Sequence, residues 1–196
     1  MSLVLASASR TRQSLLRNAG VVFESIPSTL DERAAERPLL EAGATPEDIA
    51  LALAMAKAAT VSAGRAGDLV IGADQVLEFE GERLTKPADM EAARRMLLRL
   101  AGQTHLLHSA LAAARGGEVI WQHVETARLV MRPLQPASIG RYLAAVGDAA
   151  LTSVGAYQIE GRGIELFERI EGDYFAILGL PLLPLLAFLR EEGAIE

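Results

Sequence analysis

Leu69-Val70-Ile71-Gly72-Ala73-Asp74-Gln75-Val76-Leu77 is the stretch of sequence that decides the fold. It opens with three branched aliphatic residues, which is typical of a strand buried on both faces. Gly72 and Ala73 have little side-chain bulk, so another backbone or a ligand can come close just before Asp74. A buried carboxylate without a partner is costly. Asp74 therefore either has a cation, a metal or several donors beside it, or merely caps a turn.

The composition is that of a soluble globular protein. The chain has 196 residues, enough for one domain with a large core, and 51% of them are hydrophobic. A net charge of -6 argues against non-specific binding to nucleic acid or to an anionic membrane surface. We find no run of the ~20 apolar residues that a membrane span needs. The sequence predicts a single domain over residues 1–196.

The numbers and positions of cysteine and histidine residues limit the kinds of catalytic and metal site that the chain can form. The chain has no cysteine, which excludes a disulfide framework and thiolate catalysis and suits a reducing cytoplasm. The three histidines, His105, His108 and His123, lack the spacing of a zinc site and are interpreted as packing residues or sheet-edge residues. We therefore expect a cytoplasmic protein whose chemistry rests on carboxylates, lysines and arginines.

Predicted strands and helices are mixed along the chain, which predicts an α/β domain with a large mixed sheet. The predicted strands are Leu3–Ala6, Val21–Ile26, the central stretch, a return arm after Glu80-Gly81-Glu82, Thr104–Ala114, Glu118–Met131, Ile164–Ile170 and Tyr174–Leu178. The predicted helices begin near Arg10, Asp31, Pro46, Met90, Pro136 and Pro181.

One predicted helix carries a lysine on its buried face. Thr45 as N-cap and Pro46 at the first helical position form a strong start signal. Ile49 and Leu53 mark the inward face by their spacing, and Lys57 falls on that face. Lys57 therefore either snorkels to the surface along its stem or reaches an anion in a cleft.

Arg12 lies where an anion site is expected. The strand Leu3–Ala6 is followed by small hydroxyl residues from Ser7 to Ser9, and then by the helix that begins near Arg10. A helix N-terminus after a strand and a small polar turn suits an anion, because free N–H groups and the helix dipole point at the same spot. A cation there opposes the dipole, so Arg12 either projects into solvent or contacts an anion.

Taken together, several short motifs resemble the Maf family of nucleoside triphosphate pyrophosphatases, and the resemblance covers essentially the whole chain. Each motif is weak alone, whereas their order and spacing together are strongly specific. The residues that carry the resemblance are Leu5-Ala6-Ser7-Ala8-Ser9-Arg10-Thr11-Arg12, Asp31-Glu32, Ala56-Lys57-Ala58, Ile71-Gly72-Ala73-Asp74, Lys86-Pro87, Gly155-Ala156-Tyr157, Glu160-Gly161 and Gly179-Leu180-Pro181.

The resemblance implies a fold similar to the inosine-triphosphate pyrophosphatase architecture, with two lobes around a cleft along a twisted mixed sheet, usually in a homodimer. It also implies metal-dependent hydrolysis of a nucleoside triphosphate to the monophosphate and pyrophosphate. By position, Asp74 matches the family's proposed proton acceptor. The other matching cleft residues are Ser7, Arg12, Glu32, Lys57 and Lys86.

The chemistry of these residue types agrees with that activity. Cleavage between the α- and β-phosphorus puts further negative charge on a leaving group that is already anionic, so cations are needed there. Lys57, Lys86 and Arg12 would supply them. Glu32 and Asp74 offer the hard oxygen ligands that Mg²⁺ or Mn²⁺ takes, and Asp74 could instead activate the attacking water.

Three positions bear on the choice of base, namely Thr11, Gln75 and Glu160. The thymidine/uridine triphosphate branch of the family typically has Arg, Thr and Gln there, and the 7-methyl-guanosine triphosphate branch has Trp, Gln and Glu. Gln75 and Glu160 match the second branch, whereas Thr11 matches neither. A carboxylate at position 160 can accept hydrogen bonds from the N–H edge of guanine. A methylated guanine nucleotide is therefore the favoured substrate, with a broad range of triphosphates as the alternative.

Two classes of function remain open at this stage. One is an enzyme that removes non-standard nucleotides before polymerases use them. The other is a nucleotide-binding regulator of cell division that acts by protein contact. A regulator has no need of Asp74, Lys57 and Lys86 together, whereas a hydrolase does. A nucleic-acid-binding module is disfavoured by the acidic charge and by an aromatic content of only 5%.

Overall fold

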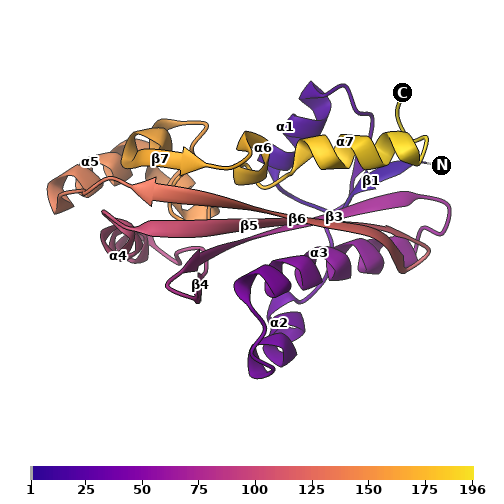
Figure 1. Cartoon of the computed structure of the whole chain (residues 1–196), viewed down its shortest axis with the longest axis horizontal. Helices are drawn as coiled ribbons and strands as arrows, with labels where there is room; N and C mark the ends of the chain where they lie inside the picture. Colours follow the sequence, from indigo (N-terminus) through magenta and orange to yellow (C-terminus); the bar gives the residue numbers. More distant parts are fainter. Residues whose placement is uncertain (1) are drawn as a thin grey trace. The chain divides into compact units, whose positions relative to one another are not determined.

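The computed structural model describes residues 2–196, which form an α/β fold with helices around a central mixed sheet of seven strands (Figure 1). The strands are β1 (Leu3–Leu5), β2 (Glu24–Ser25), β3 (Leu69–Phe79), β4 (Glu82–Leu84), β5 (Thr104–Arg115), β6 (Glu118–Met131) and β7 (Phe167–Glu171). Their order in the sheet is β2-β1-β3-β5-β6-β7, and β4 pairs with β3. The predicted fold class is thereby confirmed.

The helices are α1 (Arg10–Asn18), α2 (Glu32–Glu41), α3 (Pro46–Ala63), α4 (Met90–Leu100), α5 (Pro136–Val146), α6 (Tyr174–Ile177) and α7 (Leu182–Glu191), with 3₁₀ turns η1 (Gly147–Thr152) and η2 (Arg162–Leu166). Six of these helices begin within one residue of a predicted start, whereas α6 lies where the sequence predicts a strand. No helix within residues 2–196 is both long and apolar enough to cross a membrane.

The chain divides into two compact units. The first comprises the residues up to Gln75 together with His108–Glu125 and Asp173–Glu196, and the second comprises Val76–Leu107 and Thr126–Gly172. The single domain expected from the sequence stays a prediction, and each unit is described by itself.

The first unit is built on parallel strands. β1 pairs with β3 in the register Leu3↔Leu69 to Leu5↔Ile71, and it pairs with β2 on its other edge. Side chains alternate between the two faces of a strand, so odd-numbered residues of β3 face one way and even-numbered residues face the other. In Figure 1, α1 and α7 lie on one side of these strands, and α2 and α3 lie on the other. Leu69, Ile71 and Ala73 belong to the core beneath α1 and α7.

The face of β3 that meets α3 holds the even-numbered residues. Val70 packs there with Val4, Ala6 and the partly buried Val61 of α3. Asp74 is two pleats further along the same face, and only 7% of its surface is exposed. The alternation therefore puts Asp74 toward α3 and puts its neighbour Gln75 on the face of α1 and α7.

The second unit contains the β3–β4 hairpin, the paired parts of β6 and β7, and the helices α4 and α5. β3 and β4 pair antiparallel through the predicted turn, in which Glu80 and Gly81 both have positive φ. β6 and β7 also pair antiparallel, and α4 packs against α5. Buried His105 contacts Tyr157 through Nε2 at 2.7 Å from the hydroxyl, which fits its predicted packing role. Burial lowers the pKa of His105 to about 4, so the ring is neutral at physiological pH.

Three predicted strands are wrong in whole or in part. Tyr174–Leu178 is helical as α6, because Asp173 caps the segment by accepting a hydrogen bond from the Ala176 N–H at 2.8 Å. A short apolar run does not separate a strand from a buried helical turn, and the cap signal decides here. Ile164–Ile170 begins as η2 and becomes β7 only at Phe167. Of Val21–Ile26, only Glu24–Ser25 pairs as a strand.

Candidate active site

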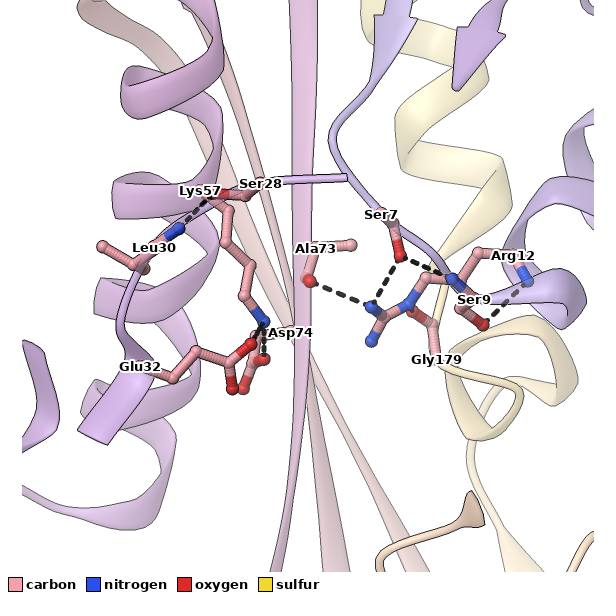
Figure 2. Close-up of polar contacts among 10 residues, drawn as sticks. All are labelled: Ser7, Ser9, Arg12, Ser28, Leu30, Glu32, Lys57, Ala73, Asp74 and Gly179. Carbon is pink, nitrogen blue, oxygen red and sulfur yellow. Dashed lines mark hydrogen bonds and ion pairs between the residues drawn. The ribbon is translucent and has the colours of Figure 1, made fainter. Parts of the chain in front are cut away.

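In the first unit, a largely buried lysine ammonium lies between two carboxylates. Lys57 Nζ is 2.6 Å from Asp74 Oδ1 and 2.9 Å from Glu32 Oε1. Figure 2 shows the three side chains pointing toward one another. The side chains of Lys57 and Asp74 are only 11% and 10% exposed, whereas that of Glu32 is 49% exposed. We call these three residues the ion cluster. Of the two alternatives for Lys57, the structure shows contact with anions, which are carboxylates of the chain itself.

Local structure explains why these three side chains meet. Thr45 and Asp48 close a reciprocal capping box that starts α3, so the helix reaches Lys57 three turns later with Lys57 on its buried face. Glu32 is the first residue of α2, whose N-cap Asp31 accepts a hydrogen bond from the Ala34 N–H. The three members therefore come from the start of α2, the middle of α3 and the central strand β3.

Gly72 sets how closely β3 approaches α3. A Cβ at this position would overlap the carbonyl oxygen of Ala54 and would lie 2.7 Å from the backbone nitrogen of Ala58. Only a residue without a side chain allows this approach. Because Lys57 and Asp74 flank the contact on the helix and on the strand, the close approach brings their charged atoms within hydrogen-bonding distance.

The electrostatics of the ion cluster are set by burial. Burial raises the pKa of the Asp74 carboxyl, and the neighbouring Lys57 ammonium opposes that rise. The charge of Arg12 lowers the same pKa, and the charge of Glu32 raises it. A carboxylate with a raised pKa is a better proton acceptor at neutral pH than an exposed one.

Arg12 forms a second group of contacts on the opposite side of β3 (Figure 2). Its Nε donates to the Gly179 carbonyl at 2.7 Å, and its Nη1 donates to the Ala73 carbonyl at 2.9 Å and to Ser7 Oγ at 3.3 Å. β1 ends at Leu5, so the guanidinium occupies the β3 edge just beyond the carboxyl end of β1. Burial lowers the pKa of Arg12, but a guanidinium stays charged at any physiological pH.

The expected anion site at the start of α1 is partly used by the chain itself. Ser9 is the N-cap, and its Oγ accepts a hydrogen bond from the Arg12 N–H at 3.3 Å. The Arg12 side chain, which the sequence assigns either to solvent or to an anion, contacts backbone carbonyls and a hydroxyl instead. Its role in binding substrate stays a prediction.

Gln75 points away from the ion cluster, on the same side of β3 as Arg12. Its Nε2 is 2.9 Å from Ser109 Oγ, 3.0 Å from the Ile177 carbonyl oxygen and 3.2 Å from that of Ala176. Thr11 lies on α1 in the same unit and is partly exposed. Sequence reasoning missed Ser109, although a serine among the alanines and leucines of strand β5 was a usable signal.

Lys86 and Glu160 belong to the second unit. Lys86 is exposed in the segment between β4 and α4, and Glu160 is exposed just before η2. That these two residues act together with the ion cluster stays a prediction.

The two carboxylates of the ion cluster are the residues expected to hold the metal. Within residues 2–196, no group of three or more histidine, cysteine, aspartate or glutamate side chains is arranged to hold a metal ion. One oxygen of Glu32 and one oxygen of Asp74 nevertheless each lie within 2.9 Å of the same positive group, the Lys57 ammonium. Mg²⁺ is often held by one or two carboxylates, with substrate phosphates and water completing its shell. These two hard oxygen donors therefore fit such a cation.

Comparisons with known proteins point to one family. The model of the family described as Maf-like protein matches residues 2–192. A 7-methyl-GTP pyrophosphatase of Mesorhizobium japonicum is 58% identical over 194 residues, which cover 99% of this chain and 98% of that protein. A protein of the same name from Brucella abortus is 56% identical, over 100% of this chain and 98% of that protein. A nucleoside triphosphate pyrophosphatase of Caulobacter vibrioides is 52% identical, over 97% and 96%.

Proposed function

Because this chain belongs to the Maf-like protein family, we propose that it is a nucleoside triphosphate pyrophosphatase. In the reaction, a water oxygen bonds to the α-phosphorus and the bond from that phosphorus to the α–β bridging oxygen breaks. The nucleoside monophosphate and pyrophosphate are the products. The single observation that carries the proposal is the Lys57 ammonium held between the Asp74 and Glu32 carboxylates.

Asp74 is the residue that would accept the proton of the attacking water. Burial raises its pKa, which favours proton uptake, and Lys57 at 2.6 Å fixes the direction of the carboxylate. A positioned general base typically contributes about 10²- to 10⁴-fold to a rate. Asp74 is therefore essential in this mechanism.

Lys57 has two roles in the proposal. In the ligand-free protein, the positive charge of Lys57 offsets the negative charges of Asp74 and Glu32, which would otherwise repel each other. With substrate present, the same ammonium is one of the cations that stabilise the charge developing on the phosphates. Arg12 and Lys86 complete the proposed set of cations.

We propose that the activity depends on a divalent cation, Mg²⁺ or Mn²⁺. Glu32 and Asp74 would hold it, and when bound it supplies positive charge to the triphosphate. A carboxylate that binds a metal directly is a poorer base. Glu32, which is the more exposed of the two acids, is therefore the better candidate for direct binding.

The proposed substrate is 7-methyl-GTP. Two relatives that are 56–58% identical over nearly the whole chain carry that substrate in their names. The pair Gln75 and Glu160 is the one that the corresponding branch of the family typically has, whereas Thr11 departs from its tryptophan. We further propose that the protein acts in the cytoplasm as a homodimer and keeps modified nucleotides out of nucleic acids.

A nucleotide panel tests the proposed function. Purified protein is given 7-methyl-GTP, GTP, dTTP, UTP, CTP and ATP with Mg²⁺ or Mn²⁺, and the products are separated by anion exchange. We expect the highest kcat/KM for 7-methyl-GTP, with monophosphate and pyrophosphate as the products. A preference for dTTP or UTP would reject the substrate, and release of orthophosphate with a nucleoside diphosphate would reject the reaction.

A further inference from the structure

The side-chain amide of Gln75 is anchored through its nitrogen. Its NH₂ group has two protons and faces three oxygens, which are Ser109 Oγ at 2.9 Å, the Ile177 carbonyl at 3.0 Å and the Ala176 carbonyl at 3.2 Å. Two of these acceptors are carbonyls at the end of α6, and that of Ala176 also accepts a hydrogen bond from the Gly179 N–H at 2.8 Å. The amide nitrogen of Gln75 therefore adds to the capping of α6 that the backbone provides.

Ser109 determines the direction of this hydrogen-bond network. It is fully buried on β5, and its hydroxyl donates to the Ala176 carbonyl at 2.6 Å. The hydroxyl has one proton, and that proton is used in this bond. Ser109 Oγ can therefore only accept from Gln75, which must present its NH₂ group.

The opposite orientation of the amide is excluded by the same atoms. Rotation by 180° would turn Gln75 Oε1 toward two carbonyl oxygens and a hydroxyl whose proton is already donated, with no donor to receive it. With the nitrogen held, the oxygen lies at the other corner of the planar amide. Gln75 is partly exposed, so a ligand can reach it.

We propose that Ser109 is a positioning residue that makes Gln75 a hydrogen-bond acceptor toward the nucleobase. This rests on the proposed function in taking the ligand to be a nucleotide whose base lies against Gln75. An acceptor at this point favours a base whose edge carries N–H donors, as guanine and its 7-methyl derivative do at N1 and N2. It disfavours cytosine, which presents the acceptors N3 and O2 on the corresponding edge.

The variant Ser109→Ala tests the proposal, and Ser62→Ala is its matched control. Ser62 is equally buried, and its hydroxyl likewise donates to a carbonyl, that of Ala59 at 3.2 Å, and accepts a hydrogen bond, from the Gly117 N–H at 3.0 Å. Both variants lose a buried hydroxyl and two hydrogen bonds, but only Ser109 contacts Gln75. A general loss of stability affects both variants, whereas a change in base preference is expected for one.

Binding of the product monophosphates by calorimetry is the measurement, since it needs no catalysis. We expect Ser109→Ala to weaken binding of 7-methyl-GMP by about 3- to 10-fold, the effect of one net hydrogen bond, while its affinity for CMP stays within about 2-fold. In steady-state kinetics with 7-methyl-GTP, Ser109→Ala should raise KM by a similar factor and leave kcat nearly unchanged. Ser62→Ala should leave the ratio of the two affinities unchanged. An unchanged ratio in Ser109→Ala, or an equal change in Ser62→Ala, would overturn the proposal.

Nuclear magnetic resonance tests the anchor without any ligand. We expect the side-chain NH₂ signals of Gln75, assigned by their loss in Gln75→Glu, to exchange slowly with water in the wild type and at least about 10-fold faster in Ser109→Ala. Rapid exchange in the wild type would contradict the anchor. If the anchor and the base preference are observed but the wild type releases no pyrophosphate, the proposed function fails while this inference stands.

Discussion

Replacing Lys57 by methionine tests the ion cluster by its effect on stability. Methionine retains most of the apolar stem of lysine, so the change removes the ammonium while leaving much of the packing. Asp74, whose side chain is 10% exposed, then loses the cation at 2.6 Å. Removing one partner of a buried ion pair costs about 3–5 kcal/mol, because a buried charge is left uncompensated. Glu32 is 49% exposed and stays hydrated, so we expect about 3 kcal/mol, the lower end of that range.

The loss should depend on pH in a defined direction. Burial already raises the pKa of Asp74 in the folded protein, and removal of the ammonium raises it further. A carboxyl with a raised folded-state pKa favours the native state below its unfolded pKa, and this contribution is lost as the pH rises through the folded pKa. The cost of Lys57→Met should therefore be largest at pH 7.5 and should shrink as the pH falls toward 4.

Urea denaturation followed by circular dichroism at several pH values measures this cost. The exposed Lys86 provides the control, since Lys86→Met should change the free energy of unfolding by no more than about 0.5 kcal/mol. Adding Asp74→Asn to Lys57→Met removes the uncompensated charge and should recover part of the stability. A loss below about 1 kcal/mol at pH 7.5, or a loss that does not vary with pH, would refute the reasoning, since an uncompensated buried charge costs more.

Three further predictions concern the surroundings of the ion cluster. Gly72→Ala should lower the free energy of unfolding in urea by about 1–3 kcal/mol and should lower kcat, because the added Cβ overlaps the Ala54 carbonyl. A free energy of unfolding and a kcat equal to those of the wild type would show that β3 and α3 separate at no cost. Arg12→Lys should lower the melting temperature in calorimetry, because one ammonium does not reproduce the bonds to Gly179, Ala73 and Ser7; an unchanged melting temperature would argue against that role. EDTA should abolish pyrophosphate release with the circular dichroism spectrum unchanged, and Mg²⁺ or Mn²⁺ should restore it; full activity in EDTA would exclude metal dependence.

The strand β3, the helix α3 and the buried face of that helix could be predicted from the sequence. The aliphatic run before Asp74 marks a buried strand, and the spacing from Ile49 to Lys57 places the lysine inward; the structure shows both. A helix is predicted to begin near Asp31, and Asp31 is the N-cap of α2. These features follow from local periodicity and capping, which the sequence carries within a few residues.

Side-chain partners from distant parts of the chain could not be predicted in this way. Arg12 bonds to a carbonyl 167 positions away, and no local pattern contains that contact. The same holds for Ser109, which meets Gln75 only because β3, β5 and α6 converge. The strand expected at Tyr174–Leu178 is wrong because five apolar residues fit a helical turn as well as they fit a strand.

The pyrophosphate released by Asp74→Asn is the most direct measure of the central claim, that the ion cluster performs the hydrolysis. Asparagine keeps the size of aspartate and removes its charge and its basicity. We expect a variant that melts cooperatively like the wild type but releases pyrophosphate from 7-methyl-GTP at least about 10²-fold more slowly. Near wild-type release by the folded variant would contradict the claim, because a buried carboxylate paired to Lys57 would then have no part in the chemistry.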